Sequence, residues 1–109
     1  MQRSVTVYHS LREAIRELYG PERHIAGHRQ VSGGDINDAG EIVLDDGARL
    51  FMKSNAVRAF DNFSAEAGGL IAMRRTGTVQ VPALLGIGKD PEGFSFLLME
   101  YIESERPSV

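Results

Sequence analysis

A lysine and a glutamate in this chain each lie next to apolar residues that favour burial. Lys53 directly follows the apolar run 50–52, whose composition is typical of a β-strand. Glu66 stands beside an apolar stripe, because Phe63 and Leu70 are three and four residues away and share its side of a helix. A charge in such surroundings is costly to bury without a partner, so each residue could satisfy the other. The alternative is that Lys53 extends to solvent and Glu66 lies at the edge of the stripe.

A glycine-containing segment precedes both charges. Ser32-Gly33-Gly34-Asp35 lies between two β-prone runs, and adjacent glycines permit backbone conformations that other residues resist. Such pairs more often mark a turn or a bulge than a ligand site. The segment matches neither the GxxxxGK[ST] phosphate loop nor the G-x-G-x-x-G loop of protein kinases. The order of glycine loop, strand, strand ending in lysine and helix with glutamate is nevertheless the one with which a kinase-type fold holds ATP phosphates.

Metal and thiol chemistry are not indicated by the sequence. Asp35, Asn37 and Gly40 partly mimic a calcium loop, but its fifth and twelfth positions are Ala39 and Asp46, and strands are expected on both sides of it. The histidines, at positions 9, 24 and 28, have no recognisable ligand spacing. The chain has no cysteine, which excludes a disulfide, a thiol nucleophile and a zinc ribbon, and favours a reducing compartment.

The composition is that of an ordinary globular protein. The 109 residues are 42% hydrophobic and 25% charged, with a formal net charge of -3. This length suits one domain over residues 1–109 with a modest core. Acidic and basic residues are interspersed, so we expect no nucleic-acid partner and no membrane partner. The start lacks the layout of a signal peptide and no apolar run approaches about 20 residues, so a cytoplasmic location is expected.

The surrounding pattern predicts the elements that position these residues. Ser10 and Glu13 have the spacing of a capping box for a helix over 10–19, and Gly77 would end a second helix over 61–76. Gly68 and Gly69 inside the second helix should cost about 1 kcal/mol each relative to alanine, and close approach to a strand would explain them. Strands are expected at 25–31, 41–44, 49–53, 81–87 and 94–102, with turns at 45–47 and 90–93.

Four motifs, in this order and spacing, resemble the fructosamine (ketosamine) kinase family. They are VSGGDINDA at 31–39, LFMKSN at 50–55, FSAEA at 63–67 and LLMEYI at 97–102. The resemblance covers nearly the whole chain, and the related aminoglycoside and choline kinases share the same plan. It implies an α+β fold of the protein-kinase-like N-terminal lobe type, with a five-stranded antiparallel sheet and one principal helix in addition to the N-terminal helix.

The resemblance also implies a site for the phosphates of ATP. Lys53 would contact the α- and β-phosphates, and Glu66 would pair with Lys53 and fix its position. The backbone amides of Gly33, Gly34 and Asp35 would cover the phosphates. Asp35 would bring a negative side chain close to the polyphosphate, which favours a side chain that points away or addresses a cation.

The hinge and the reaction follow from the same resemblance. The Glu100 carbonyl and the Ile102 amide would bond adenine. In the family, the γ-phosphoryl group passes to a sugar hydroxyl of a glycated amine, which serves deglycation. The magnesium ligands and the acceptor base would lie in a C-terminal lobe that has no counterpart in this chain. We therefore expect this chain to be the ATP-binding lobe of a ketosamine kinase and to be inactive alone. It would be either a fragment of a longer kinase or the product of a truncated gene.

The alternative reading is a free-standing small lobe without catalysis that serves assembly or regulation. An isolated lobe would expose the apolar surface that a second lobe covers, and such surfaces promote association. A homodimer is therefore expected, formed by that exposed sheet face or by exchange of the glycine-rich hairpin.

Overall fold

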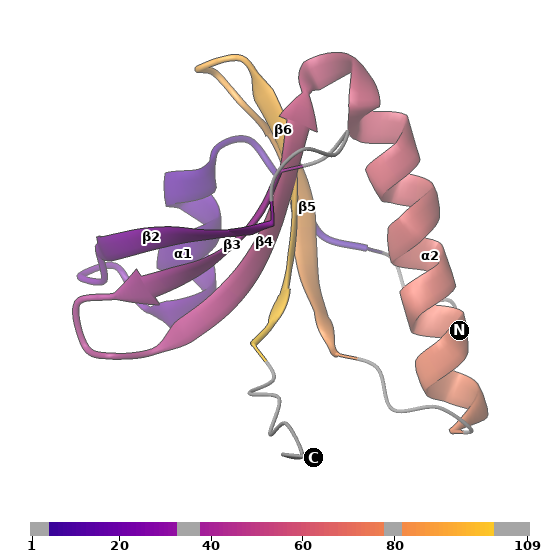
Figure 1. The fold of residues 1–109 in the computed structure, drawn as a ribbon, viewed down its shortest axis with the longest axis horizontal. Coiled ribbons are helices and arrows are strands. Elements are labelled where there is room, and N and C mark those ends of the chain that lie inside the picture. The colour runs from indigo at the N-terminus through magenta and orange to yellow at the C-terminus, as the bar shows by residue number, and fades with distance from the viewer. Residues whose placement is uncertain (1–4, 33–37, 78–81, 102–109) are drawn as a thin grey trace.

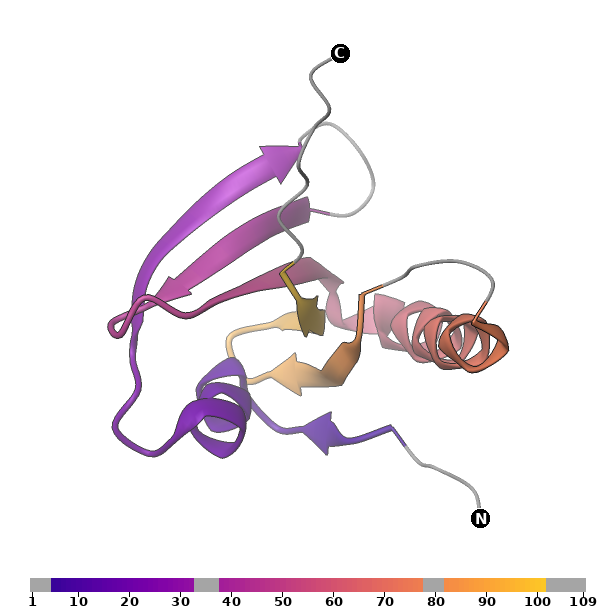
Figure 2. The ribbon, with the colours of Figure 1, turned by 90° about the horizontal axis from the view of Figure 1, so that it is seen from below.

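One mixed sheet organises the fold. The computed structural model describes residues 5–32, 38–77 and 82–101, and its strands form a six-stranded sheet in the order β1-β5-β6-β4-β3-β2 (Figures 1 and 2). The elements are β1 (Val7–Tyr8), α1 (Leu11–Tyr19), β2 (Ile25–Ser32), β3 (Asp38–Leu44), β4 (Arg49–Ala56), the 3-10 turn η1 (Val57–Ala59), α2 (Phe60–Thr76), β5 (Leu84–Asp90) and β6 (Phe94–Glu100). The fold is therefore α+β, as expected.

The expectation of five antiparallel strands is wrong by one strand. Val7 and Tyr8 pair in parallel with Ile87 and Gly88, and the Ile87 N–H donates to the Thr6 carbonyl at 3.1 Å. All other neighbouring strands are antiparallel. Two residues are too few for alternation to signal a strand. The contact that holds β1 is instead tertiary, because the Tyr8 side chain is buried against β5.

The ends of α1 are those that the sequence predicts. The Ser10 Oγ accepts a hydrogen bond from the Glu13 N–H at 2.9 Å, which satisfies one free amide of the first turn. Gly20 ends the helix with a φ of 117°, a conformation that favours glycine. A further contact comes from the β5–β6 hairpin, where Asp90 Oδ2 accepts from the Leu11 N–H at 2.8 Å. The helix is thus fixed to the hairpin as well as capped locally.

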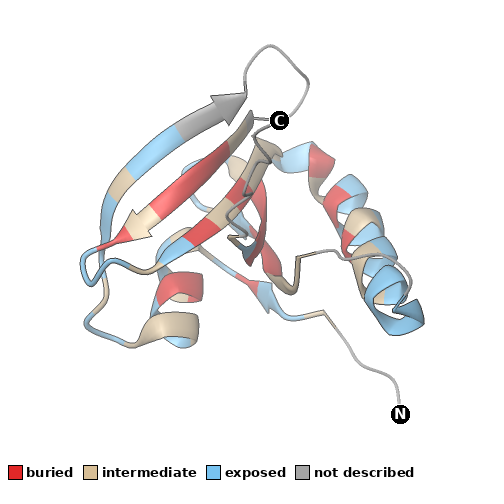
Figure 3. Cartoon of the chain, turned by 60° about the horizontal axis from the view of Figure 1, so that its bottom comes forward, coloured by how far each residue is buried: buried red, intermediate tan, exposed pale blue. Residues whose placement is uncertain are grey.

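The two helices pack on opposite faces of the sheet, each over its own apolar cluster. α1 contributes Ala14 and Ile15 to one cluster, and α2 contributes Phe63 and Ala67 to the other. The strand residues buried with α1 are Tyr8, Ile42, Leu44, Leu50, Met52, Phe96 and Leu98, and those buried with α2 are Ile87, Leu97 and Met99. Figure 3 colours the buried residues red, and they lie on the strands and on parts of both helices. Because strand residues alternate between faces, Lys53 shares the face of α2.

The expectation that Gly68 and Gly69 allow a close approach to a strand is wrong. Both are exposed, and a Cβ atom built on either would meet no atom within 4 Å. Phe63 and Ala67 define the buried side of α2, and each residue advances about 100° around a helix. Residues 68 and 69 therefore point away from the sheet, and packing does not explain them.

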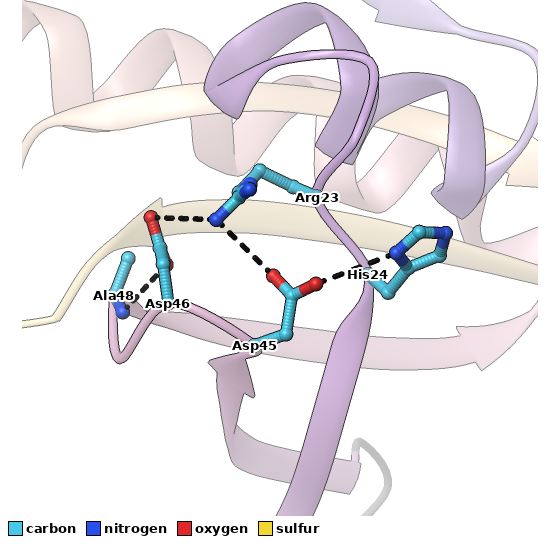
Figure 4. Close-up of polar contacts among 5 residues, drawn as sticks. All are labelled: Arg23, His24, Asp45, Asp46 and Ala48. Carbon is cyan, nitrogen blue, oxygen red and sulfur yellow. Dashed lines mark hydrogen bonds and ion pairs between the residues drawn. The ribbon is translucent and has the colours of Figure 1, made fainter.

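A polar cluster joins the β3–β4 turn to the connection between α1 and β2 (Figure 4). Arg23 Nη1 lies 3.4 Å from Asp45 Oδ1 and 3.3 Å from Asp46 Oδ2, and His24 Nδ1 lies 3.4 Å from Asp45 Oδ2. Desolvation by itself would raise the pKa of Asp45, but hydrogen bonds from His24 and the charge of Arg23 outweigh it and lower the pKa. Gly47, with φ at 93°, completes the predicted turn.

Candidate functional site

Lys53 and Glu66 form the predicted ion pair. The Lys53 ammonium on β4 lies 2.5 Å from Glu66 Oε2 on α2. The two side chains are 28% and 35% exposed, so water reaches both charges. An ammonium carries three donors, so Lys53 can contact a second anion while Glu66 holds it in place. The pair therefore offers a fixed positive charge at the surface of the sheet.

Packing of α2 on the sheet explains why these two side chains meet. Lys53 stands opposite Leu97 of β6 in the strand register. Phe63 and Ala67 of α2 belong to the same buried cluster as Leu97. Glu66 precedes Ala67 directly and follows Phe63 by one helical turn, so this packing brings its carboxylate to Lys53.

The start of α2 is fixed by a buried hydroxyl. The Ser95 Oγ, on fully buried Ser95 of β6, donates to the Ala56 carbonyl at 2.7 Å. Ala56 ends β4, and η1 leads from there into α2 without a side-chain cap. Ala59 of η1 is buried as well. The strand that carries Lys53 and the helix that carries Glu66 are therefore joined by a short connection that is held to β6.

The glycine loop joins β2 to β3, the strand that pairs with Lys53. β2 ends at Ser32 and β3 begins at Asp38, and the register pairs Ser32 with Ala39 and Ala39 with Lys53. Residues 33–35, predicted to cover phosphates, lie outside the described residues, so their role stays a prediction. The register therefore brings the β3 end of this loop next to Lys53 and leaves its β2 end one strand further away.

The predicted hinge begins at a residue with several contacts. The Glu100 N–H donates to the Ala83 carbonyl at 2.9 Å, and Glu100 Oε1 accepts from the Ala83 N–H at 2.8 Å. Arg74 Nη1, from the last turn of α2, lies 3.9 Å from the same carboxylate oxygen. Ile102 lies outside the described residues. The proposed bonds of both hinge residues to adenine remain predictions.

Sequence reasoning missed a buried carboxylate on the face of Lys53. Glu41 of β3 is 5% exposed, and Arg49 Nε of β4 lies 3.0 Å from Glu41 Oε2. Arg29 Nη1 of β2 lies 3.9 Å from Glu41 Oε1. The Arg49 guanidinium carbon lies 4.9 Å from the centre of the Tyr101 ring. The predicted turn at 45–47 could have indicated this contact. It sets Val43 opposite Arg49, so Glu41, two residues before Val43 on the same face, is the diagonal neighbour of Arg49.

A pocket of about 390 Å³ lies on the other side of the sheet, and it is lined by α1, the start of β2 and the β5–β6 hairpin. Its lining includes neither Lys53 nor Glu66. In the part of the chain that the structure describes, no three His, Cys, Asp or Glu side chains gather in a way that could hold a metal ion. Over the same residues, neither helix has the length and apolar character needed to cross a membrane.

The topology and the ion pair define a class of protein. A largely antiparallel sheet, in which a strand lysine pairs with a glutamate of the long helix beside it, is typical of the kinase-like fold. Within that class, the chain belongs to the fructosamine kinase family, whose family model matches residues 7–108.

Individual relatives agree with this assignment. The chain is 34% identical over 99 residues to a probable ketoamine kinase of Synechocystis, and 37% identical over 84 residues to a chloroplastic protein-ribulosamine 3-kinase of Oryza sativa. These alignments cover 91% and 77% of the chain. The crystal structure of a Haemophilus somnus protein that carries a fructosamine-3-kinase name superposes with a TM-score of 0.79 at 27% identity and covers 91% of the chain.

The chain is much shorter than these relatives. The alignments span 33% of the Synechocystis protein, 24% of the rice protein and 33% of the Haemophilus chain. The activity of a whole relative therefore comes to this chain only as a proposal. The rice relative carries a chloroplastic name, so the cytoplasmic location expected from the sequence also stays a prediction.

Proposed function

We propose that this chain is the ATP-binding lobe of a kinase that transfers the γ-phosphoryl group of ATP to a sugar hydroxyl of a glycated amine. The fructosamine kinase family supports phosphoryl transfer, and the names of relatives as ketoamine and ribulosamine kinases support a glycated amine as the acceptor. The mouse relative, a ketosamine-3-kinase, is 35% identical over 89 residues.

The observation that carries the proposal is the position of the Lys53–Glu66 pair. Lys53 lies in β4, an interior strand of the sheet, and its ammonium is 2.5 Å from Glu66 Oε2. It also pairs with Ala39 of β3, the strand that follows the glycine loop. A lysine fixed in this way can contact phosphate oxygens, while Glu66 keeps its side chain from moving into solvent. The proposed role of Glu66 is therefore to orient Lys53, and that of Lys53 is to bind phosphate.

Among the described residues, no three His, Cys, Asp or Glu side chains form a group that could hold a metal ion, and Glu66 is bound to Lys53. We assign the magnesium ligands and the residue that activates the acceptor hydroxyl to the part of the relatives that their alignments with this chain do not cover. The chain itself would bind and orient the nucleotide.

Binding of ATP to the unaltered chain tests this proposal. NMR titration with ATP should show weak, saturable binding, because half of a two-lobed cleft buries little of the ligand. The Lys53→Met chain should bind ATP about tenfold more weakly, since one charge-assisted contact to phosphate is lost. The Glu66→Gln chain should lose part of that affinity, because Lys53 would then lack its ionic partner.

Lys89 supplies the matched control. It is the other lysine of the chain, it is exposed on β5, and its ammonium lies 4.9 Å from the centre of the Phe60 ring. The Lys89→Met chain should bind ATP as the unaltered chain does. Saturable binding that is equally strong in the Lys53→Met chain would contradict the assignment of Lys53 to phosphate.

A further inference from the structure

The face of the sheet that carries Lys53 has a second fixed cation, Arg49, on the same strand. Lys53 stands opposite Leu97 and Phe51 opposite Met99, and Arg49 lies on the same face of β4, just before the last paired residues, Leu50 and Glu100. Lys53 and Arg49 are four positions apart, which is about 13 Å along a strand. A nucleotide with its phosphates at Lys53 and its base toward the hinge would extend in this direction.

Glu41 fixes the orientation of the Arg49 side chain. The Glu41 carboxylate is nearly fully buried, and its Oε2 lies 3.0 Å from Arg49 Nε. A buried carboxylate is destabilising without a partner, so this contact is maintained more strongly than a surface ion pair. Arg29 is 73% exposed and lies 3.9 Å from the same carboxylate, so it contributes less.

Arg49 in turn contacts the first residue after β6. Its guanidinium carbon lies 4.9 Å from the centre of the Tyr101 ring, within the range of a cation–π contact. Tyr101 follows the last residue of β6, so no strand pairing holds it. Glu100, just before it, is held by Ala83 through both backbone and side chain. The chain leaving β6 is thus fixed at Glu100 from the β5 side and at Tyr101 from the β4 side.

We propose that Arg49 is a positioning residue for the nucleobase, because Glu41 holds its guanidinium against Tyr101 and so fixes the start of the hinge relative to Lys53. This inference rests on the proposed function and adds that recognition of the base and of the phosphates depends on different ends of β4. Loss of Arg49 should therefore weaken binding of the base while leaving binding of the phosphates unchanged.

Three probes separate these two contributions. We would titrate adenosine, inorganic tripolyphosphate and ATP into the chain and its variants, with the amide NMR spectrum as the check on folding. The Arg49→Gln chain should bind adenosine and ATP about fivefold more weakly and tripolyphosphate with unchanged affinity. The Arg49→Lys chain should show the same selective loss for adenosine, because an ammonium lacks the planar face that stacks on Tyr101.

Arg16 is the matched control, since it is an exposed arginine on α1, on the other side of the sheet. The Arg16→Gln chain should bind all three probes as the unaltered chain does. Equal losses of adenosine and tripolyphosphate in the Arg49→Gln chain, or no loss of adenosine, would overturn the inference and leave the proposed function standing. If the unaltered chain binds none of the three probes, the proposed function fails and this inference fails with it.

Discussion

Tyr8 of β1 lies so close to Gly88 of β5 that a Cβ atom at Gly88 would be 2.5 Å from the Tyr8 carbonyl oxygen. The same atom would be 2.6 Å from Cζ of the fully buried Phe96 ring. Neither neighbour can yield cheaply, because one is backbone and the other is packed in the cluster under α1. Glycine at position 88 therefore allows β1 and Phe96 to lie this close to β5.

The first prediction follows from that contact. The Gly88→Ala chain should lose about 2 kcal/mol of unfolding free energy, because overpacking forces β1 or Phe96 to move. Urea unfolding followed by circular dichroism measures the change. The control is Gly27→Ala in edge strand β2, where an added Cβ meets no atom within 4 Å, so its stability should stay within about 0.5 kcal/mol. Equal losses in the two chains would show that the close contact is not the cause.

The two exposed glycines of α2 give a prediction of opposite sign. Neither Gly68 nor Gly69 has a positive φ, and an added Cβ would meet nothing. Each substitution to alanine should therefore stabilise the chain by about 1 kcal/mol, which raises Tm by roughly 4–8 °C. Gly77, the cap of the same helix, has a φ of 70°, so Gly77→Ala should destabilise. Thermal unfolding that ranks these three substitutions otherwise would contradict the geometry of α2.

The Asp45 cluster should make stability depend on pH in the acid range. The pKa of Asp45 is lowered below its usual 3.8, because hydrogen bonds from His24 and the charge of Arg23 outweigh the opposing desolvation. A lowered carboxyl pKa stabilises the fold above the unfolded-state value, and this stabilisation is lost as the pH falls through the folded-state value. The Asp45→Asn chain should therefore be less stable than the unaltered chain at pH 7, and the difference should shrink below about pH 4.

Unfolding curves between pH 7 and pH 2 measure that difference. Glu22→Gln removes an exposed carboxylate from the same connection between α1 and β2 and serves as the control. It should lower stability at pH 7 by less than Asp45→Asn does, since the cluster joins Asp45 and not Glu22 to Arg23. A difference between the Asp45→Asn and unaltered chains that grows toward low pH would reverse the predicted sign.

Local signals made much of the fold predictable. Ser10 with Glu13 marked the start of α1, Gly47 marked the β3–β4 turn, and Gly77 marked the end of α2. Each of these depends on hydrogen bonds or backbone angles within a few residues. The Lys53–Glu66 pair was predictable for a related reason, because both charges stood beside apolar stripes in a known order.

Contacts between distant segments could not be predicted in this way. The Leu11 N–H bonds to Asp90 across 79 positions, and no local pattern marks Asp90 as a helix cap. The outward orientation of Gly68 depends on which stripe of α2 the sheet buries, and α2 carries small residues on several sides. Glu41 required the register of β3 and β4 before its contact with Arg49 was visible.

The last prediction is that the chain alone transfers no phosphoryl group. Transfer to a hydroxyl needs a carboxylate to accept or orient its proton and ligands for magnesium. Glu41 and Glu66 direct their carboxylates to the face of Lys53, and each is bound to a cation, Arg49 and Lys53 respectively. Neither is available to accept a proton from a sugar hydroxyl.

We would incubate the chain with ATP, magnesium and a small fructosamine, and follow the phosphorylated product by phosphorus NMR. The mouse ketosamine-3-kinase relative would be the positive control, with turnover at least about a thousandfold above the chain's. Turnover by the chain that falls in the Glu66→Gln variant would instead place the chemistry on the residues described.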